Sequence, residues 1–418
     1  MKILGRLGKN ILGLGGLQIA NFLITLVMIP YLTRVFGVEG WGEIVFALLL
    51  INYLVWFSNW GFYLGAVQKI AACRNLRDEV SAIACQVWCA QLLLTATAIL
   101  CVLVYSFYFS KLSLTPLFIA GISLLIGNLM TPLWILNGLE RVWEASLIQF
   151  LAKLLAVPFI LFLVHAQADA ATYIYINGIA SISIGLCYLF WLVKSGQILL
   201  TKVCIKGVYE RILMEKRLFV TSITGSMTEA VIPTFLGWSG NIEALGLFNI
   251  ADRIKSAGIT VLHPVVHALY PRMSHLLSAN KKQAIELLKT SGLMLLIASG
   301  LISLVIWLFS SYLVALLAGN EFHGAAAYLN WLAAIPFVST ISSFIIYQIL
   351  VPAGEERYFL YWSMIVLILN LLLIYPLVQL LGGVGAAITS FMSSLVALGV
   401  LFLMLRSAWG IHFPKEAK

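Results

Sequence analysis

The sequence predicts an all-α polytopic membrane protein of about 12 transmembrane helices, arranged as two six-helix lobes around a central cavity. Composition supports this first: 61% of the 418 residues are hydrophobic and only 10% are charged, and the mean hydropathy is +1.00. A soluble domain is about half apolar and a quarter charged. The apolar residues also fall in runs of roughly 20, the length of one bilayer crossing. Most of the chain is therefore expected to lie in lipid.

Each apolar run is assigned as one helix, because a helix satisfies its own backbone hydrogen bonds in lipid. The loops between the runs are short, and the longest is expected to extend from Lys194 to Arg217. No soluble domain fits between the spans. The expected spans are 12–32, 42–66, 82–108, 114–136, 147–165, 173–193, 218–238, 245–270, 291–318, 327–350, 359–381 and 384–405.

The basic residues predict the orientation, since cytoplasmic loops of membrane proteins are enriched in Lys and Arg. Of the 26 Lys and Arg residues, only Arg34 and Lys111 fall in predicted outer loops, and Lys153, Arg253 and Lys255 fall within spans. Both termini are thus expected in the cytoplasm. The net charge of +9 then faces the anionic inner leaflet, so it does not call for a nucleic-acid partner. The first span is expected to act as an uncleaved anchor.

The two halves of the chain look related. A glycine-rich turn with a Glu follows the first span at 36–47, and a similar turn follows the seventh span at 240–251. Two six-span halves that both start inside form a parallel repeat about an axis along the membrane normal, as in many secondary transporters. We therefore expect an N-terminal lobe at 1–205 and a C-terminal lobe at 206–418.

Span 245–270 contains three ionisable residues, Asp252, Arg253 and Lys255. Ionised groups at bilayer depth cost several kcal/mol and usually face a cavity or pathway. At about 3.6 residues per turn, one side of this helix is polar, and Asp252 and Lys255 can pair at i, i+3. Either a cationic lining that binds an anionic group or an ion pair that joins helices explains the pattern. The polar side comprises Arg253, Ser256, Thr260, His263 and His267, and the opposite side Ile254, Gly258, Val261, Val265 and Leu269.

Other polar residues within spans are candidates for coupling, gating or binding. Glu229 in span 218–238 is expected to be buried, either for proton coupling or for a helix–helix hydrogen bond. Lys153 either contacts an anionic ligand or extends to the headgroups. Arg34 and Glu43 bracket the first outer loop and suggest a gate contact or a headgroup contact. In the first span, a cavity wall and a hydrogen-bonded seam explain one polar face equally well: Gln18, Asn21 and Thr25.

Metal, disulfide and cofactor chemistry are not expected. Pro264 separates His263 from His267, and no carboxylate follows nearby, so packed or cavity-lining histidines are favoured over a metal site. The six cysteines form no CxxC motif and fall in spans or in reducing cytoplasmic loops. No motif for a cofactor is present.

Several short motifs resemble the polysaccharide transporter family, and within it the O-antigen flippases of Wzx type, members of the superfamily of multidrug, oligosaccharidyl-lipid and polysaccharide exporters. The resemblance implies translocation of an undecaprenyl-diphosphate-linked oligosaccharide, with membrane lipid as surroundings and O-antigen polymerase and chain-length regulator as candidate partners. It also implies that Arg253 contacts the diphosphate. The motifs are Pro30-Tyr-Leu-Thr-Arg34-Val-Phe-Gly37-Val-Glu-Gly-Trp-Gly42, Asn137-Gly138-Leu-Glu140-Arg141, Ala251-Asp252-Arg253 and Tyr270-Pro271-Arg272-Met-Ser274.

Three functions are consistent with these patterns. A lipid-linked oligosaccharide flippase is favoured, because the candidate lining is net cationic. A cation-coupled multidrug antiporter of the sister type would instead need acidic cavity residues. A membrane enzyme that acts on the same lipid-linked sugar would display its catalytic groups on a large outer loop, and the predicted outer loops are short. The chain is thus expected to be a transporter and not an enzyme.

Overall fold

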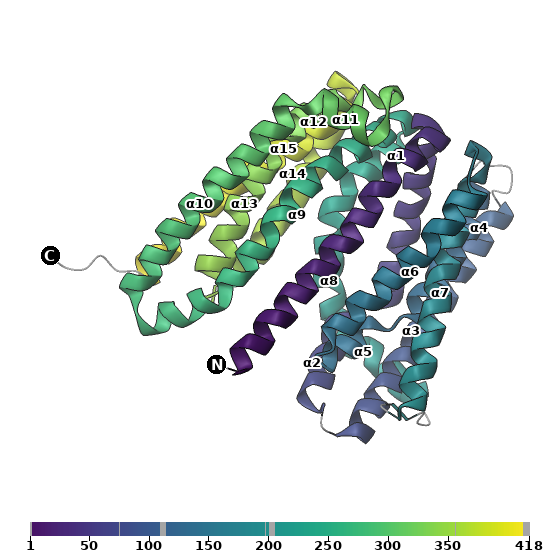
Figure 1. Ribbon diagram of the computed structural model, residues 1–418, viewed down its shortest axis with the longest axis horizontal. Helices are drawn as coiled ribbons and strands as arrows, with labels where there is room; N and C mark the ends of the chain where they lie inside the picture. The colour runs from purple at the N-terminus through teal and green to yellow at the C-terminus, as the bar shows by residue number, and fades with distance from the viewer. Residues whose placement is uncertain are drawn as a thin grey trace. The chain divides into compact units, whose positions relative to one another are not determined.

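The computed structural model describes residues 2–74, 76–108, 114–196, 198–199, 205–355 and 357–412. Within them the chain consists of helices joined by turns, with no strand (Figure 1). It divides into two compact units, Met1–Ile223 and Thr224–Lys418, here called unit one and unit two. The chain is an all-α polytopic membrane protein, as its composition predicts.

Unit one holds seven α-helices, one short 3₁₀ turn and the first part of α8. Its elements are α1 (Lys2–Asn59), α2 (Phe62–Ala72), α3 (Arg77–Tyr108), α4 (Thr115–Met130), α5 (Leu133–Gly138), α6 (Val142–Leu163), η1 (Gln167–Asp169), α7 (Ala170–Lys194) and α8 (Ile205–Trp238), which continues into unit two.

Unit two begins within α8 and, in its described residues, is also built of helices joined by turns. Its further elements are α9 (Ile242–Ala279), α10 (Lys281–Leu308), α11 (Ser310–Ala318), η2 (Asn320–Phe322), α12 (Ala325–Leu332), α13 (Ile335–Ile345), the π-helix η3 (Ile346–Leu350), α14 (Arg357–Leu381) and α15 (Val384–His412).

Nine stretches of the described residues are long and apolar enough to cross a membrane. The first, Leu23–Ala72, has 50 residues, which at about 1.5 Å per residue is long enough for two crossings. Helices α8 and α9 are not among the nine, although two of the twelve expected spans fall on them. Both helices carry several charged residues, which lower their hydropathy.

Four expected spans are interrupted, two of them in unit one, which corrects the simple one-run, one-helix assignment. Span 42–66 is broken where Trp60 and Gly61 adopt positive φ angles of 40° and 73°. Glycine is needed at position 61, because a Cβ there would lie 2.6 Å from the backbone nitrogen of Phe219. Span 114–136 is broken between α4 and α5 at Thr131–Pro132, where Pro132 lacks the N–H that would continue the helix.

The long loop expected from Lys194 to Arg217 is also wrong in its second half, because α8 already begins at Ile205. Its charged residues suggested a loop, yet Arg211 and Glu215 are buried. The contacts of this segment lie in unit one: Trp60 stacks on Phe219 with ring centroids 4.1 Å apart, and its Nε1 donates to the Ile212 carbonyl at 2.9 Å. The division between units consequently falls at 223/224, later than the boundary at 205/206 taken from the sequence.

Helices α4 and α7 lie side by side in unit one (Figure 1), and small residues allow the close approach. A Cβ on Gly178 of α7 would lie 1.9 Å from the Oγ of Ser123 and 2.7 Å from its backbone carbon. A Cβ on Gly127 of α4 would lie 2.8 Å from the Cβ of Ser181. Small residues at helix interfaces are typical in membranes, where dispersion between closely packed backbones drives association.

Candidate functional site

The charged part of α9 is ordered by contacts within the helix. Asn241 caps the start of α9, since its side chain accepts a hydrogen bond from the Ala244 backbone at 3.2 Å. Further along, the Nε of Arg253 donates to the Oδ1 of Asn249 at 3.0 Å, and both residues are half-buried. Asn249, one turn earlier, thereby helps to orient the guanidinium of Arg253. Sequence reasoning did not single out Asn249, although its i, i+4 spacing from Arg253 is visible in the chain.

Asp252 and Lys255 form the expected i, i+3 ion pair, so this prediction is confirmed. The Lys255 side chain is 15% exposed and that of Asp252 35%. A carboxylate and an ammonium that are both partly withdrawn from water stabilise each other more than a surface pair does. The pair neutralises these two charges and leaves Arg253 as the net charge of the Asp252–Lys255 segment.

The remaining polar residues of α9 follow the predicted side only in part. Ser256 and Thr260 are half-buried, and the Thr260 hydroxyl donates to the Ser256 carbonyl at 2.8 Å. His263 is exposed. His267 lies outside the described side chains.

The apolar side of α9, opposite the predicted polar side, is only partly buried. Ile254 and Gly258 are buried, but Val261 is 67% exposed and Val265 36%. The buried residues recur every four positions, from Ile254 and Gly258 to Leu262 and Val266. Leu262 and Val266 pack with Leu295 of α10.

Glu229 of α8 is exposed, which corrects the expectation of a buried carboxylate. The buried residues in this part of α8 are Ala230, Ile232 and Leu236, and all three follow Glu229 in the chain. Nearby, the Nδ2 of Asn370 on α14 donates to the Thr228 carbonyl at 3.2 Å, so α8 is tied to α14 through its backbone.

In unit one, Lys153 of α6 is exposed, and its Nζ donates to the Thr25 hydroxyl of α1 at 3.1 Å. The structure therefore joins Lys153 to the polar face of the first span, a pairing that sequence spacing could not predict. Gln18 and Asn21 of that face lie outside the described side chains. Arg34 is exposed and Glu43 half-buried on either side of Gly37, where the backbone of α1 leaves the helical conformation with φ 66°.

A charged cluster that sequence reasoning missed lies in unit one. The Nζ of Lys69 on α2 lies 2.9 Å from the Oε1 of Glu215 on α8, and the Nη1 of Arg211 lies 3.6 Å from the same oxygen. The Nη2 of Arg211 donates to Gln86 of α3 at 3.2 Å. The i, i+4 spacing of Arg211 and Glu215 could have indicated their pairing, but the contact with Lys69 depends on tertiary structure.

A second missed network consists of neutral side chains at the break in the second span. The Oδ1 of Asn59 accepts from Gln91 at 2.9 Å and from Asn128 at 3.1 Å. The Oε1 of Gln91 in turn lies 3.4 Å from the indole nitrogen of Trp134. These bonds connect α1, α3, α4 and α5 at the end of α1.

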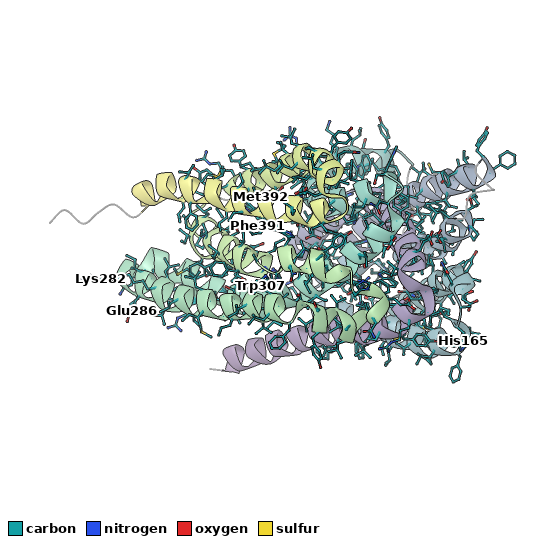
Figure 2. The ribbon with its side chains drawn as sticks, turned by 90° about the horizontal axis from the view of Figure 1, so that it is seen from above. His165, Lys282, Glu286, Trp307, Phe391 and Met392 are labelled. Carbon is teal, nitrogen blue, oxygen red and sulfur yellow. The ribbon has the colours of Figure 1, made fainter. Side chains whose placement is uncertain are left out.

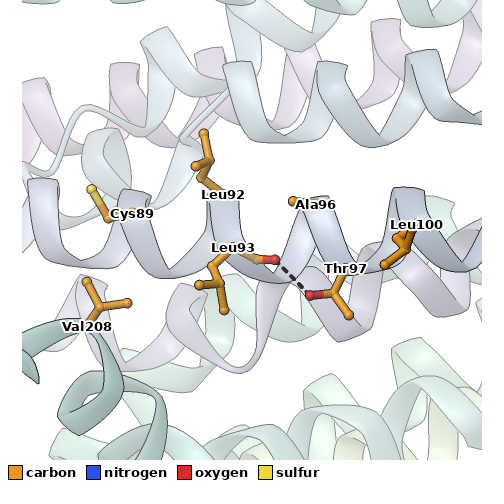
Figure 3. Close-up of a pocket in the computed structure, with 7 residues that line it drawn as sticks. All are labelled: Cys89, Leu92, Leu93, Ala96, Thr97, Leu100 and Val208. Carbon is orange, nitrogen blue, oxygen red and sulfur yellow. Dashed lines mark hydrogen bonds between the residues drawn. The ribbon is translucent and has the colours of Figure 1, made fainter. Parts of the chain in front are cut away.

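A shallow apolar cavity of about 540 Å³ lies on α3 where α8 approaches it. Figure 3 shows its lining, in which the only hydrogen bond drawn is internal to α3, from Thr97 to the Leu93 carbonyl at 3.0 Å. None of the residues expected at the site lines it. Within the described residues, no group of three His, Cys, Asp or Glu side chains could hold a metal ion. The cavity residues are Cys89, Leu92, Leu93, Ala96, Thr97, Leu100 and Val208.

The fold and the charged α9 define a polytopic all-α membrane protein with half-buried charged residues on one of its helices. Residues 7–277 match the family described as polysaccharide biosynthesis protein. This match covers well over half of the sequence, and the chain belongs to that family. The match includes Lys153, Arg253 and the Ala251-Asp252-Arg253 motif, so the resemblance seen in the motifs is confirmed. Residues 218–376 also match the MatE family.

Two curated relatives span nearly the whole chain, and each is named "Putative O-antigen transporter". The relative from Escherichia coli (strain K12) is 27% identical over 96% of this chain and 97% of its own length. The relative from Shigella dysenteriae is 24% identical over 95% of this chain and 98% of its own length.

Solved structures of multidrug resistance MATE-family transporters of the MOP superfamily show a similar fold. An inward-facing structure has a TM-score of 0.75 at 16% identity and covers 95% of this chain and 96% of its own. An outward-facing structure has a TM-score of 0.61 at 17% identity, with 97% and 96% covered. At these identities the likeness establishes the fold alone.

Proposed function

We propose that this chain is a flippase. It moves undecaprenyl-diphosphate-linked O-antigen repeat units from the cytoplasmic to the periplasmic leaflet of the bacterial inner membrane. Transport occurs by alternating access, in which inward-open and outward-open states exchange around a polar site. Membership of the polysaccharide biosynthesis family and the names of the two relatives support this substrate class.

The observation that carries the proposal is the Arg253 guanidinium, half-buried on α9 and held by Asn249. Arginine presents a planar fork of donors that matches phosphate oxygens and stays charged at any physiological pH. In this proposal Arg253 binds the diphosphate. Lys255 and Lys153 add positive charge, and Ser256, Thr260 and His263 supply hydrogen bonds to the diphosphate or the sugars.

Four further residues have proposed roles in coupling or gating. Glu229 carries the coupling proton, and its exposure in α8 gives that proton access to a carboxylate. Asp252 holds Lys255 in place through their ion pair. Arg34 and Glu43 flank the non-helical Gly37 and take part in gating there. Both termini face the cytoplasm in this arrangement.

The alternative is a cation-coupled antiporter of the multidrug and toxin extrusion type. It is favoured by the MatE match over residues 218–376 and by the multidrug transporters among the structures of similar fold. The two functions differ in the charge they require, because a cationic drug needs a net acidic site. The net positive segment around Arg253 favours the anionic lipid-linked substrate.

The test is to delete the gene in its own host, extract the lipids and determine in which leaflet the undecaprenyl-diphosphate sugar unit accumulates. A flippase leaves single units on the cytoplasmic side and no polymer outside. Single, unpolymerised units on the periplasmic side would show that translocation still occurs, and would contradict the proposal. Unchanged O-antigen together with increased sensitivity to cationic drugs would support the antiporter.

A further inference from the structure

The buried carboxylate of Glu215 organises a charged cluster where α2 meets α8. Its side chain is 3% exposed, and its Oε1 forms ion pairs with Lys69 at 2.9 Å and with Arg211 at 3.6 Å. Gly65 makes this position possible, because a Cβ there would lie 1.9 Å from the Oε2 of Glu215. Any larger residue at position 65 would displace the carboxylate.

The two cations of the cluster differ in exposure. The Arg211 side chain is 8% exposed and also donates a hydrogen bond to Gln86. Its positive charge therefore offsets the free-energy cost of burying the Glu215 carboxylate. The Lys69 side chain is 41% exposed. An ammonium has three donors, and the contact described for Lys69 uses one of them. One carboxylate against two cations leaves the cluster with one net positive charge, at its exposed member.

A purely structural function, in which the cluster fastens α8 to α2, accounts for Arg211 and Glu215. It does not require an exposed Lys69, because the buried Arg211 already neutralises the buried carboxylate. The pairing does, however, hold a flexible lysine in one place. A cation that is already oriented loses less conformational entropy when it binds an anion.

The position of Lys69 indicates which anion it could meet. It lies in the last turn of α2, next to the segment that the distribution of basic residues predicts to be cytoplasmic. In that predicted orientation, the last turn of α2 lies near the headgroups of the cytoplasmic leaflet. Lysine is a common ligand for phosphate groups.

We infer that Lys69, positioned by Glu215, is a second phosphate-binding residue, which contacts the diphosphate of a prenyl-linked substrate at the cytoplasmic end of unit one. This inference rests on the proposed function and adds a site to it. Lys69 binds the ligand directly, whereas Glu215 acts through Lys69 and is a positioning residue.

The first experiment uses the intact, purified wild-type protein in detergent, so that no variant has to fold. Lysines are reductively methylated with and without farnesyl diphosphate, and the extent at each lysine is read by mass spectrometry. Farnesyl diphosphate should slow the methylation of Lys69 and leave Lys282 unchanged, an exposed lysine near the start of α10 (Figure 2). Equal methylation of Lys69 with and without the probe would overturn the inference. Protection by inorganic pyrophosphate as well would support it and assign recognition to the diphosphate.

Variants then separate binding from a structural role. Lys69→Met should weaken farnesyl diphosphate binding by roughly tenfold, as expected for the loss of one charge-assisted hydrogen bond. Lys69→Arg should restore most of it, and the control Lys282→Met should bind as wild type. A Lys69→Met protein that melts at a lower temperature but binds with unchanged affinity would establish the structural role and refute the inference.

The same measurements distinguish the failure of this inference from that of the proposed function. If Arg253→Ala loses binding while Lys69→Met does not, the inference is wrong and the flippase proposal stands. If the wild-type protein binds neither farnesyl diphosphate nor inorganic pyrophosphate, both are refuted.

Discussion

Replacing Gly178 by Ala tests the close packing of α4 against α7. The added Cβ would lie 2.7 Å from the backbone carbon of Ser123 and 2.5 Å from its Cβ. Ordinary contacts of a Cβ begin at 3.4 Å, so the two helices must separate by about 0.9 Å locally to relieve the contact with the Ser123 Cβ. The obstacle includes backbone, which no side-chain rotation can move away.

The expected magnitude follows from two opposing effects. Overpacking of this kind lowers the free energy of unfolding by about 1–3 kcal/mol. Alanine in the interior of a helix is more favourable than glycine by roughly 0.5–1 kcal/mol, which partly masks the cost. Gly399→Ala in α15 is the matched control, because a Cβ there would meet nothing within 4 Å. The difference between the two variants therefore isolates the packing cost.

The assay is thermal unfolding of the purified variants in the same detergent, followed by a thiol-reactive dye. For a unit of about 200 residues, 1 kcal/mol corresponds to a Tm shift of roughly 2–4 °C. Gly178→Ala should therefore melt about 2–12 °C below Gly399→Ala. Equal melting temperatures would show that α4 and α7 do not approach as closely as the structure indicates.

Three further predictions concern the site and its surroundings. Arg253→Ala should abolish surface O-antigen at normal protein level, and Arg253→Lys should restore transport only in part because the planar fork is lost; full O-antigen in Arg253→Ala would exclude Arg253 from the site. Glu229→Gln should make transport insensitive to the proton gradient, and an unchanged dependence on that gradient would remove Glu229 from coupling. Burial and the Glu79 charge raise the pKa of the Cys73 thiol, so less thiolate is present at neutral pH, and a membrane-impermeant maleimide should label Cys73 of the purified protein slowly, and faster as the pH rises. Labelling of Cys73 from the periplasmic side of intact cells would contradict the predicted orientation.

The sequence predicted the helical spans well because lipid permits few alternatives. A run of about 20 apolar residues in a bilayer satisfies its backbone groups only as a helix or in a closed barrel. The ion pair between Asp252 and Lys255 was also predictable, since residues three apart on a helix are neighbours. Hydropathy failed where the helix is polar: residues 205–217 looked like a loop, although they form the start of α8.

Sequence alone thus determined what local chemistry controls: the class of protein, most helical segments and the i, i+3 ion pair on α9. Only the tertiary structure decided that Glu215 is buried and meets Lys69, which lies 146 residues away in the chain, and that Glu229 is exposed. The physical reason is that burial depends on which surfaces meet. A charged residue on a helix looks the same in sequence whether it faces solvent, lipid or a glycine on a neighbouring helix, and only packing distinguishes these environments.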